Sequence, residues 1–270
     1  MTSETVQVLP ADTVLILGGG PVGMMTATVL SFYDVKSVVL ERNFTTTKWP
    51  KMDLTNVRSM EIFRKLGLSE GLRRRGVPSH IPYTVLVSSG LSRDSPITQW
   101  NHPSVDKYFE MIQAKNDGTM PLEPWQRISQ EIFEAWLKEL SEHDPLIDIR
   151  FGWKLESILE TERGVEATVT DLNKGKTVQF KAQYAVGCDG ASSRVRRSLD
   201  ISLDGGPVPG YVLLVHFKSN DLARLHKHGR FWHLFIARDG HMGGAAISQD
   251  EKASTNLWRF MLRLDVSNQY

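Results

Sequence analysis

Residues 13–23 read TVLILGGGPVG, and this stretch decides the fold. Its first five residues are apolar and rich in β-forming side chains, which predicts a strand buried on both faces. The glycines Gly18, Gly20 and Gly23 follow in the spacing G-x-G-x-x-G. Pro21 suits the first turn of a helix, where its missing N–H costs nothing. The stretch therefore predicts a strand, a tight turn and the start of a helix.

The residues on either side extend this pattern. A helix is expected over residues 22–33, and the apolar run KSVVLE at 36–41 predicts a second buried strand. A strand, a helix and a strand in about thirty residues form a βαβ unit. Residues 1–11 are polar and are expected to form a loose arm.

Each part of this unit suits a dinucleotide. Gly18 permits the tight turn, Gly20 lets the backbone approach a pyrophosphate, and Gly23 lets the helix pack closely on the strand. The helix N-terminus offers unpaired N–H groups and a partial positive charge, which contribute up to ~2 kcal/mol to anion binding. Glu41 ends the second strand and can accept hydrogen bonds from a ribose diol. Because its carboxylate would repel a 2′-phosphate, the site is expected to hold FAD or NAD rather than NADP.

The composition argues against several classes of protein. The chain has 270 residues, with 32 basic and 31 acidic side chains, so its net charge of +1 gives no attraction for nucleic acid. A single cysteine, Cys188, excludes an intrachain disulfide, and no Cys/His cluster has zinc-site spacing, so no metal site is expected. A reducing cytoplasmic location fits best. Residues 13–33 carry no charge, but they are better explained as strand, turn and helix than as a transmembrane segment.

The rest of the chain predicts a larger α/β protein. A helix is expected over 55–66, with Gly67 ending it, and a second begins after Ser129. Residues 83–120 are expected to leave the nucleotide domain as a polar excursion. The further expected strands are residues 165–170, 177–180, 182–186, 211–217, 231–236 and 243–247. Asn173, Lys174 and Gly175 predict a hairpin turn between the first two of them.

A second motif indicates which dinucleotide is bound. Residues 187–197 read GCDGASSRVRR. Together with the glycine motif, this segment resembles the class A flavoprotein aromatic hydroxylases, the phenol and para-hydroxybenzoate hydroxylase superfamily. Their second motif, an Asp-Gly pair followed by Ser and Arg, is matched by Asp189, Gly190, Ser193 and Arg196. The resemblance implies that this segment lies against the ribose and pyrophosphate of FAD.

Two further segments resemble the same family. Residues 48–68 resemble the segment after the second strand, and Arg58 matches an arginine that lies near the flavin and pyridine nucleotide in relatives. Residues 126–137, QRISQEIFEAWL, resemble a helix whose leading glutamine contacts FAD. Gln130 is the better match for that glutamine, and Gln126 is the alternative.

The resemblance implies a fold and its domains. The expected fold is α/β, a Rossmann-like FAD-binding domain of the GR2 type, as in para-hydroxybenzoate hydroxylase, with an incomplete mixed β-sheet substrate domain. The FAD-binding domain is expected over 11–82 and 121–205, and the partial substrate domain over 83–120 and 206–270. The family's third motif, a Gly-Asp pair, is not found, since Asp239-Gly240 has the opposite order. The chain is therefore expected to be a fragment or a truncated gene product.

The resemblance also implies an activity. Relatives use NAD(P)H to reduce FAD and transfer oxygen from dioxygen to an electron-rich ring, so a phenolic or polycyclic aromatic substrate is expected. A homodimer is a further expected partner. Asp53 matches an aspartate of the phenol hydroxylase branch and is the candidate catalytic base. The residues expected to bind the cofactor are Gly18, Gly20, Pro21, Val22, Gly23, Glu41, Arg42, Arg58, Gln130, Asp189 and Gly190.

Other conspicuous residues are expected to be structural. Tyr83, His216 and His233 are interpreted as packing or edge residues, and the run at 73–75 as a solvated helix end. The alternatives that stay open are a non-catalytic FAD-binding remnant and another FAD oxidoreductase. An NAD dehydrogenase is disfavoured because it would continue the βαβ pattern after Glu41.

Overall fold

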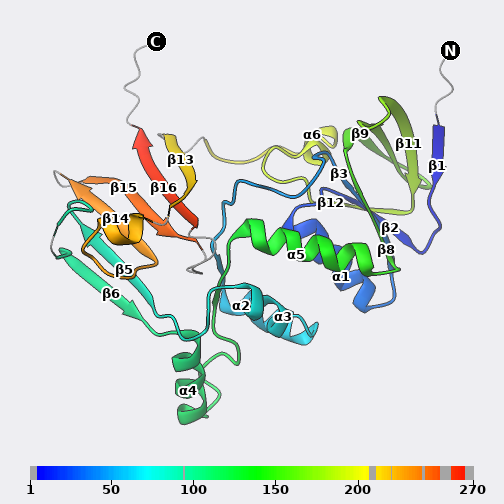
Figure 1. Ribbon diagram of the computed structural model, residues 1–270. Coiled ribbons are helices and arrows are strands. Elements are labelled where there is room, and N and C mark those ends of the chain that lie inside the picture. Colours follow the sequence, from blue (N-terminus) through cyan, green and yellow to red (C-terminus); the bar gives the residue numbers. More distant parts are fainter. Residues whose placement is uncertain are drawn as a thin grey trace. The chain divides into compact units, whose positions relative to one another are not determined.

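The computed structural model describes residues 5–93, 95–206, 211–219, 221–238, 241–249 and 257–264 (Figure 1). By its contacts the chain divides into two compact units. The first unit comprises residues 1–48 and 131–205, and the second comprises residues 49–130 and 206–270. Asp239 and Gly240, the pair compared with the family's third motif, lie outside the described residues.

The first unit is built on a parallel sheet that confirms the predicted βαβ arrangement. Its strands lie in the order β12-β2-β3-β8, and every neighbouring pair is parallel. Helix α1 connects β2 to β3 and packs on both of them and on β8. The elements are β2 (Thr13–Leu17), α1 (Pro21–Phe32), β3 (Lys36–Glu41), β8 (Ile147–Phe151) and β12 (Tyr184–Gly187).

A second sheet in this unit has the order β1-β11-β10-β9. Its strands are β1 (Thr5–Val8), β9 (Trp153–Thr161), β10 (Gly164–Asp171) and β11 (Lys176–Ala182). Strands β10 and β11 form the predicted hairpin, with Gly175 at φ +64° in its turn. The prediction of a loose arm over residues 1–11 was wrong for Thr5–Val8, because β1 pairs in parallel with β11.

Alternate residues of β2 and β3 enter two different cores, as expected for strands buried on both faces. One core joins the parallel sheet to the sheet of β1, β11, β10 and β9; it includes Leu15, Leu17, Val38, Leu40, Ala167, Val169 and Phe180. The other lies beneath α1 and consists of Ile16, Ala27, Val39 and Ile147. Each buried Val, Leu, Ile or Phe side chain in these cores contributes about 1.5–3 kcal/mol to stability. The strand end that carries the glycine turn is therefore held on two sides.

Two more helices belong largely to the first unit, α5 (Gln130–His143) and α6 (Arg194–Ser198). Phe133, Trp136 and Leu137 of α5 are buried, as the apolar pattern predicts. The same face also buries Glu134, whose carboxylate accepts a hydrogen bond of 2.8 Å from the backbone N–H of Thr47.

The second unit contains a six-stranded mixed sheet in the order β13-β16-β15-β14-β5-β6. All neighbouring pairs are antiparallel except β14 and β5. The strands are β5 (Tyr83–Ser88), β6 (Thr98–His102), β13 (Tyr211–Lys218), β14 (His233–Arg238), β15 (His241–Ser248) and β16 (Leu257–Leu264). This confirms the second sheet that the last sixty residues predicted.

Short elements complete the second unit: β4 (Leu54–Thr55), α2 (Val57–Lys65), α3 (Ser69–Arg75), α4 (Val105–Lys115), β7 (Gln126–Arg127) and α7 (Leu222–Leu225). Helix α2 begins two residues later than predicted, because Thr55 pairs with β7 and Asn56 caps the helix by accepting from Ser59 N–H at 2.9 Å. Gly67, at φ +73°, follows the end of α2 as expected. The excursion at 83–120 is more regular than its polarity suggested, since it contains β6 and α4.

The contact units differ from the predicted domain boundaries at residues 49–82 and 121–130, which pack with the mixed sheet. Strand β4 pairs with β7, and the N–H of Val77 donates to the Arg127 carbonyl at 2.9 Å. Arg73 was expected to be solvated, but its side chain is only 9% exposed and forms an ion pair of 2.6 Å with Glu123. Local polarity could not predict this burial, because Glu123 is 50 residues away in the sequence.

Within the described ranges, no helix is both long enough and apolar enough to cross a membrane.

Candidate functional site

The glycine turn after β2 leaves no room for side chains at two positions. A Cβ placed on Gly18 would lie 2.4 Å from the carbonyl oxygen of Cys188, and the backbone of Gly18 has φ +113°. A Cβ on Gly23 would lie 1.8 Å from the carbonyl oxygen of Gly18. Both positions therefore require glycine, the first for its conformation and the second for the contact between helix and turn.

The start of α1 is open to a ligand. Gly20 is the N-cap residue, Pro21 occupies the first turn, and no side chain of the described residues caps the helix. A Cβ on Gly20 would meet no atom within 4 Å. The backbone N–H groups of the first turn, those of Val22 and Gly23, are thus available to an anion, as at other helix N-termini that bind phosphate.

The Glu41 carboxylate is directed at this turn. Its Oε2 accepts a hydrogen bond of 2.8 Å from the backbone N–H of Gly19. Its Oε1 accepts from the backbone N–H and the side-chain amide of Asn43, at 2.9 and 2.6 Å. Because a carboxylate offers about four lone-pair positions, these three bonds leave acceptor capacity for a ligand hydroxyl. Arg42, the next residue, is exposed.

The second motif lies against the first. Strand β12 pairs with β2, and the N–H of Cys188 donates to the Leu17 carbonyl at 2.7 Å. Asp189 accepts hydrogen bonds from Ser193 Oγ and from the N–H of Arg194, both at 2.5 Å. The aspartate therefore caps α6, a structural role that the sequence analysis missed. The signal was Ser193 at the N-cap, which also accepts from Arg196 N–H at 2.9 Å.

Gly190 and Cys188 are the sequence neighbours of Asp189. Gly190 has φ +77°, and a Cβ there would meet nothing within 4 Å. Burial raises the pKa of the Cys188 thiol; the contact with Thr26 lowers it and the Asp189 charge raises it further, with a net upward shift. Cys188 is therefore a protonated, weakly reactive thiol.

Three other residues with predicted cofactor roles lie in the second unit. Arg58 is 76% exposed on α2 and lies 3.9 Å from the Glu61 carboxylate. Gln130 accepts hydrogen bonds from the backbone N–H groups of Lys51 and Met52, at 2.8 and 3.2 Å. Gln126, the alternative to Gln130, is fully buried and donates to two backbone carbonyls at 2.9 Å, so its amide is committed to the fold.

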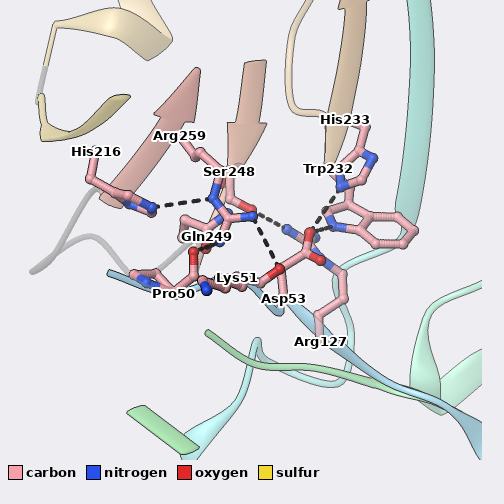
Figure 2. Close-up of polar contacts among 10 residues, drawn as sticks. All are labelled: Pro50, Lys51, Asp53, Arg127, His216, Trp232, His233, Ser248, Gln249 and Arg259. Carbon is pink, nitrogen blue, oxygen red and sulfur yellow. Dashed lines mark hydrogen bonds and ion pairs between the residues drawn. The ribbon is translucent and has the colours of Figure 1, made fainter. Parts of the chain in front are cut away.

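Asp53, the candidate base, belongs to a polar cluster in the second unit (Figure 2). Its Oδ2 accepts two hydrogen bonds of 2.9 Å, from Trp232 Nε1 and His233 Nε2. Burial raises the pKa of Asp53, but the bonds from His233 and Trp232 and the charge of Arg259 outweigh burial and bring it below the ordinary value. Asp53 is therefore a carboxylate at neutral pH.

Arg259 on β16 holds the segment that leads to Asp53. Its guanidinium, in a residue only 4% exposed, donates to the carbonyls of Pro50 and Lys51 and to the side-chain oxygen of Gln249 (Figure 2). Its Nε donates to His216 Nε2 at 3.3 Å. Burial lowers the pKa of Arg259 and the Asp53 charge partly opposes the shift. Since an arginine stays protonated in proteins, Arg259 gives the cluster a permanent positive charge that acts on Asp53.

A second buried guanidinium, that of Arg127, contacts the Trp232 ring. Arg127 is fully buried, and its Nη2 donates to the Ser248 carbonyl at 2.8 Å. Its guanidinium carbon lies 5.4 Å from the ring centroids of both Tyr83 and Trp232. These cation–π contacts fix the indole that donates to Asp53.

The strand register shows which side chains share a sheet face with this cluster. Paired residues lie on one face, and the pairing of β14, β15, β16 and β13 puts His233, Ile247, Arg259 and His216 in one row. The adjacent row on the same face is apolar: Phe235, Ala245, Met261 and Leu214. The first row, called the polar row here for His233, Arg259 and His216, lies beside an apolar row. This arrangement suits a flat ring that carries a polar substituent.

The sequence analysis found only part of this cluster. It identified Asp53 and missed Trp232, Gln249 and Arg259. His216 and His233 were interpreted as packing or edge polar residues rather than ligands, and in the structure each makes a hydrogen bond to a charged partner. No local signal marks them, because their partners lie 43 and 180 residues away in the sequence.

Comparisons with known proteins identify the cofactor class. The family described as "FAD binding domain" matches residues 12–269. The FAD-dependent monooxygenase apdD of Emericella nidulans is 56% identical over 264 residues, covering 96% of this chain and 42% of that protein. The 2,4-dichlorophenol 6-monooxygenase of Delftia acidovorans is 28% identical over 208 residues, covering 75% of this chain and 33% of that protein.

A solved structure agrees with these relatives. The flavin-dependent monooxygenase PieE, in complex with FAD and substrate, superposes with a TM-score of 0.82 and 25% identity, over 98% of this chain and 44% of that chain. The chain thus spans less than half the length of the relatives it matches. The open helix N-terminus and the carboxylate on Gly19 fit the diphosphate and ribose of FAD, the cofactor in the family's description and in the PieE complex. The chain belongs to the family described as FAD binding domain.

Proposed function

We propose that the protein is an FAD-dependent monooxygenase that hydroxylates a phenolic or polycyclic aromatic substrate with NAD(P)H and dioxygen. The observation that carries the proposal is the Glu41 carboxylate fixed on the N–H of Gly19, beside an uncapped helix N-terminus. The names of the relatives, among them a dichlorophenol monooxygenase, support the reaction class.

In this proposal the first unit binds the ADP-ribose part of FAD. The turn from Gly18 to Gly23, including Gly20, Pro21 and Val22, holds the diphosphate through backbone N–H groups. Glu41 accepts from the ribose diol, and such charge-assisted bonds contribute roughly 1.5–3 kcal/mol each. Asp189 and Gly190, next to the turn, border the same site, and Arg42 follows Glu41 at its edge.

The second unit is proposed to supply the residues that act on the substrate. Bound FAD would supply the oxygen-transfer chemistry, so the protein residues position and polarise the reactants. Gln130 fixes the backbone at Lys51 and Met52, and thereby Asp53. Arg58, exposed on α2, is proposed to attract the phosphates of the pyridine nucleotide. The apolar row beside the polar row provides the surface for the aromatic ring.

Three further expectations stay proposals. The functional domains are proposed to follow the predicted boundaries, with FAD binding in 11–82 and 121–205 and substrate binding in 83–120 and 206–270. The protein is proposed to act in the cytoplasm and as a homodimer. Sedimentation equilibrium of the purified chain tests the oligomeric state, and a single species at the monomer mass would contradict the dimer.

Flavin content and turnover test the proposed function. The purified chain is expected to show the visible flavin bands after incubation with FAD, and to oxidise NADH or NADPH faster when a phenol is added. A chain that holds flavin without any phenol-stimulated oxidation would be the non-catalytic remnant. A chain that binds no flavin would remove the basis of the proposal.

A further inference from the structure

The hydrogen bonds at Asp53 determine which nitrogen of His233 stays available. An indole N–H can only donate and an ionised carboxylate can only accept, so both bonds to Asp53 Oδ2 run toward the carboxylate. His233 Nε2 therefore carries a proton. In a neutral imidazole the other nitrogen, Nδ1, is then an acceptor. Among the residues that the structure describes, none makes a hydrogen bond to this Nδ1.

We propose that His233 is the base that removes the hydroxyl proton of the aromatic substrate, and that Asp53 is its positioning residue. The inference rests on the proposed function and changes the assignment of the base within it. Sequence comparison pointed to Asp53 alone, whereas the geometry shows a carboxylate–imidazole pair in which the carboxylate fixes the tautomer.

The proton transfer is a simple exchange of bonds. The O–H bond of the phenol breaks and leaves its electron pair on the oxygen, while a new N–H bond forms at His233 Nδ1. The product is a phenolate beside an imidazolium. The imidazolium charge is stabilised by Asp53, which stays ionised. The phenolate ring is more nucleophilic than the phenol at the positions that accept oxygen.

Asp53 is less suited to this role than its partner. Hydrogen bonds from His233 and Trp232 and the charge of Arg259 bring the pKa of Asp53 below its ordinary value despite burial, which makes it a weaker base. One of its two oxygens is already shared by two donors. These constraints fit a group that orients an imidazole.

The surroundings of His233 suit an aromatic ligand. The His233 side chain is 19% exposed and that of Asp53 is 17% exposed, whereas the residues Arg127 and Arg259 are buried. The His233 ring lies 4.2 Å from the Trp232 ring and 5.6 Å from that of Phe235, centroid to centroid.

Among the described residues, the charged and titratable groups near His233 include Asp53 before β4, Tyr83 on β5, Arg127 on β7, Arg259 on β16 and His216 on β13. The residues paired with His233 on β5 and β15 are the apolar Val85 and Ile247.

The test uses 4-nitrophenol, whose ionisation changes its visible absorption, added to the full chain with FAD. The variants are His233→Gln, Asp53→Asn and, as a control at an exposed position of the same unit, His80→Gln. Glutamine at 233 can still donate to Asp53 but has no titrating nitrogen. We expect wild type and His80→Gln to bind the probe as nitrophenolate at a pH where free nitrophenol is protonated.

The variants then separate the two candidate bases. His233→Gln is expected to bind 4-nitrophenol in its neutral form and to lose about 10²–10⁴-fold in kcat for a phenol, with an unchanged thermal midpoint. Asp53→Asn is expected to keep part of the ionisation. Added imidazole is expected to restore ionisation in His233→Ala, which a merely structural histidine would not allow.

Two outcomes would overturn the inference, and they are distinguishable. If His233→Gln still ionises the probe and Asp53→Asn does not, Asp53 is the base and the proposed function stands. If the wild type holds no flavin or does not bind 4-nitrophenol, the proposed function fails and the assignment of His233 fails with it.

Discussion

The turn at residues 18–23 and the cluster around Asp53 are built in opposite ways. The turn is made of backbone N–H groups from contiguous residues, and the acceptor for Gly19 N–H, Glu41, lies 22 residues away. The cluster is made of side chains whose hydrogen bonds span 179, 180 and 209 residues. A backbone site depends on space, so a single added Cβ damages it. A side-chain site depends on each polar partner, so it is sensitive to the loss of one group.

The largest effect is expected where the turn has no space. Gly23→Ala would bring a Cβ to 1.8 Å from the Gly18 carbonyl oxygen, and overpacking of this kind costs about 3 kcal/mol. Thermal melting is expected to show a midpoint lower by roughly 2–4 °C for each kcal/mol. Gly20→Ala is the matched control: its Cβ meets no protein atom, so it is expected to melt like the wild type and still to bind FAD poorly. Equal melting of wild type and Gly23→Ala would show that the turn is not sterically restricted.

The next effect concerns the cluster. Arg259→Met is expected to lower the free energy of unfolding by about 2–3 kcal/mol, because it leaves the Pro50 and Lys51 carbonyls and Gln249 without their charged donor. Urea unfolding measures this loss. The control is Arg224→Met, whose arginine side chain is 78% exposed and pairs with Asp221 at 2.6 Å. An exposed pair contributes about 0–1 kcal/mol. An equal loss of unfolding free energy in Arg259→Met and Arg224→Met would contradict the idea that the cluster depends on each buried polar partner.

A smaller effect is expected in cofactor affinity. Glu41→Gln keeps an oxygen acceptor near Gly19 but removes the charge, and a charge-assisted bond contributes roughly 1.5–3 kcal/mol. The dissociation constant of FAD is therefore expected to rise about 10–100-fold, measured by flavin fluorescence. Glu160→Gln, at an exposed position of β9, controls for the loss of one negative charge. If Glu41→Gln binds FAD as tightly as the wild type, Glu41 does not contribute to FAD binding.

The smallest effect is the pH dependence of stability that Asp53 contributes. Its folded-state pKa lies below the unfolded value of about 3.9, so the unfolded state binds the proton more tightly. The contribution is fully present above the unfolded pKa and is lost as pH falls through the folded pKa. The unfolding free energies of wild type and Asp53→Asn are therefore expected to converge in that acidic range. If the difference in unfolding free energy between wild type and Asp53→Asn stays constant from neutral to acidic pH, Asp53 is not an ionised carboxylate in the folded protein.

Sequence and structure agree best where interactions are local. Strands β2 and β3 match their predicted bounds, and the Asn173-Lys174-Gly175 turn joins β10 to β11 as predicted. The same local reasoning failed for Thr5–Val8, where Val6 and Val8 are exposed. Its conformation comes from pairing with β11, more than 170 residues away in the sequence. Because neither valine is buried, the local sequence carries no pattern of buried and exposed positions that would predict this strand.

The sequence by itself determined the glycine turn and the acidic residue that ends β3, since spacing within one βαβ unit sets backbone geometry directly. It also indicated the family, through the glycine motif together with residues 187–197. It did not determine that Asp189 caps α6, that Arg73 is buried, or that His233 and Arg259 converge on Asp53 and the backbone before it. The convergence on Asp53 depends on the register of β13–β16, and the burial of Arg73 depends on its pairing with Glu123, 50 residues away. Register is set by the packing of a whole sheet, and a shift of one residue would turn His233 and Arg259 to the opposite face.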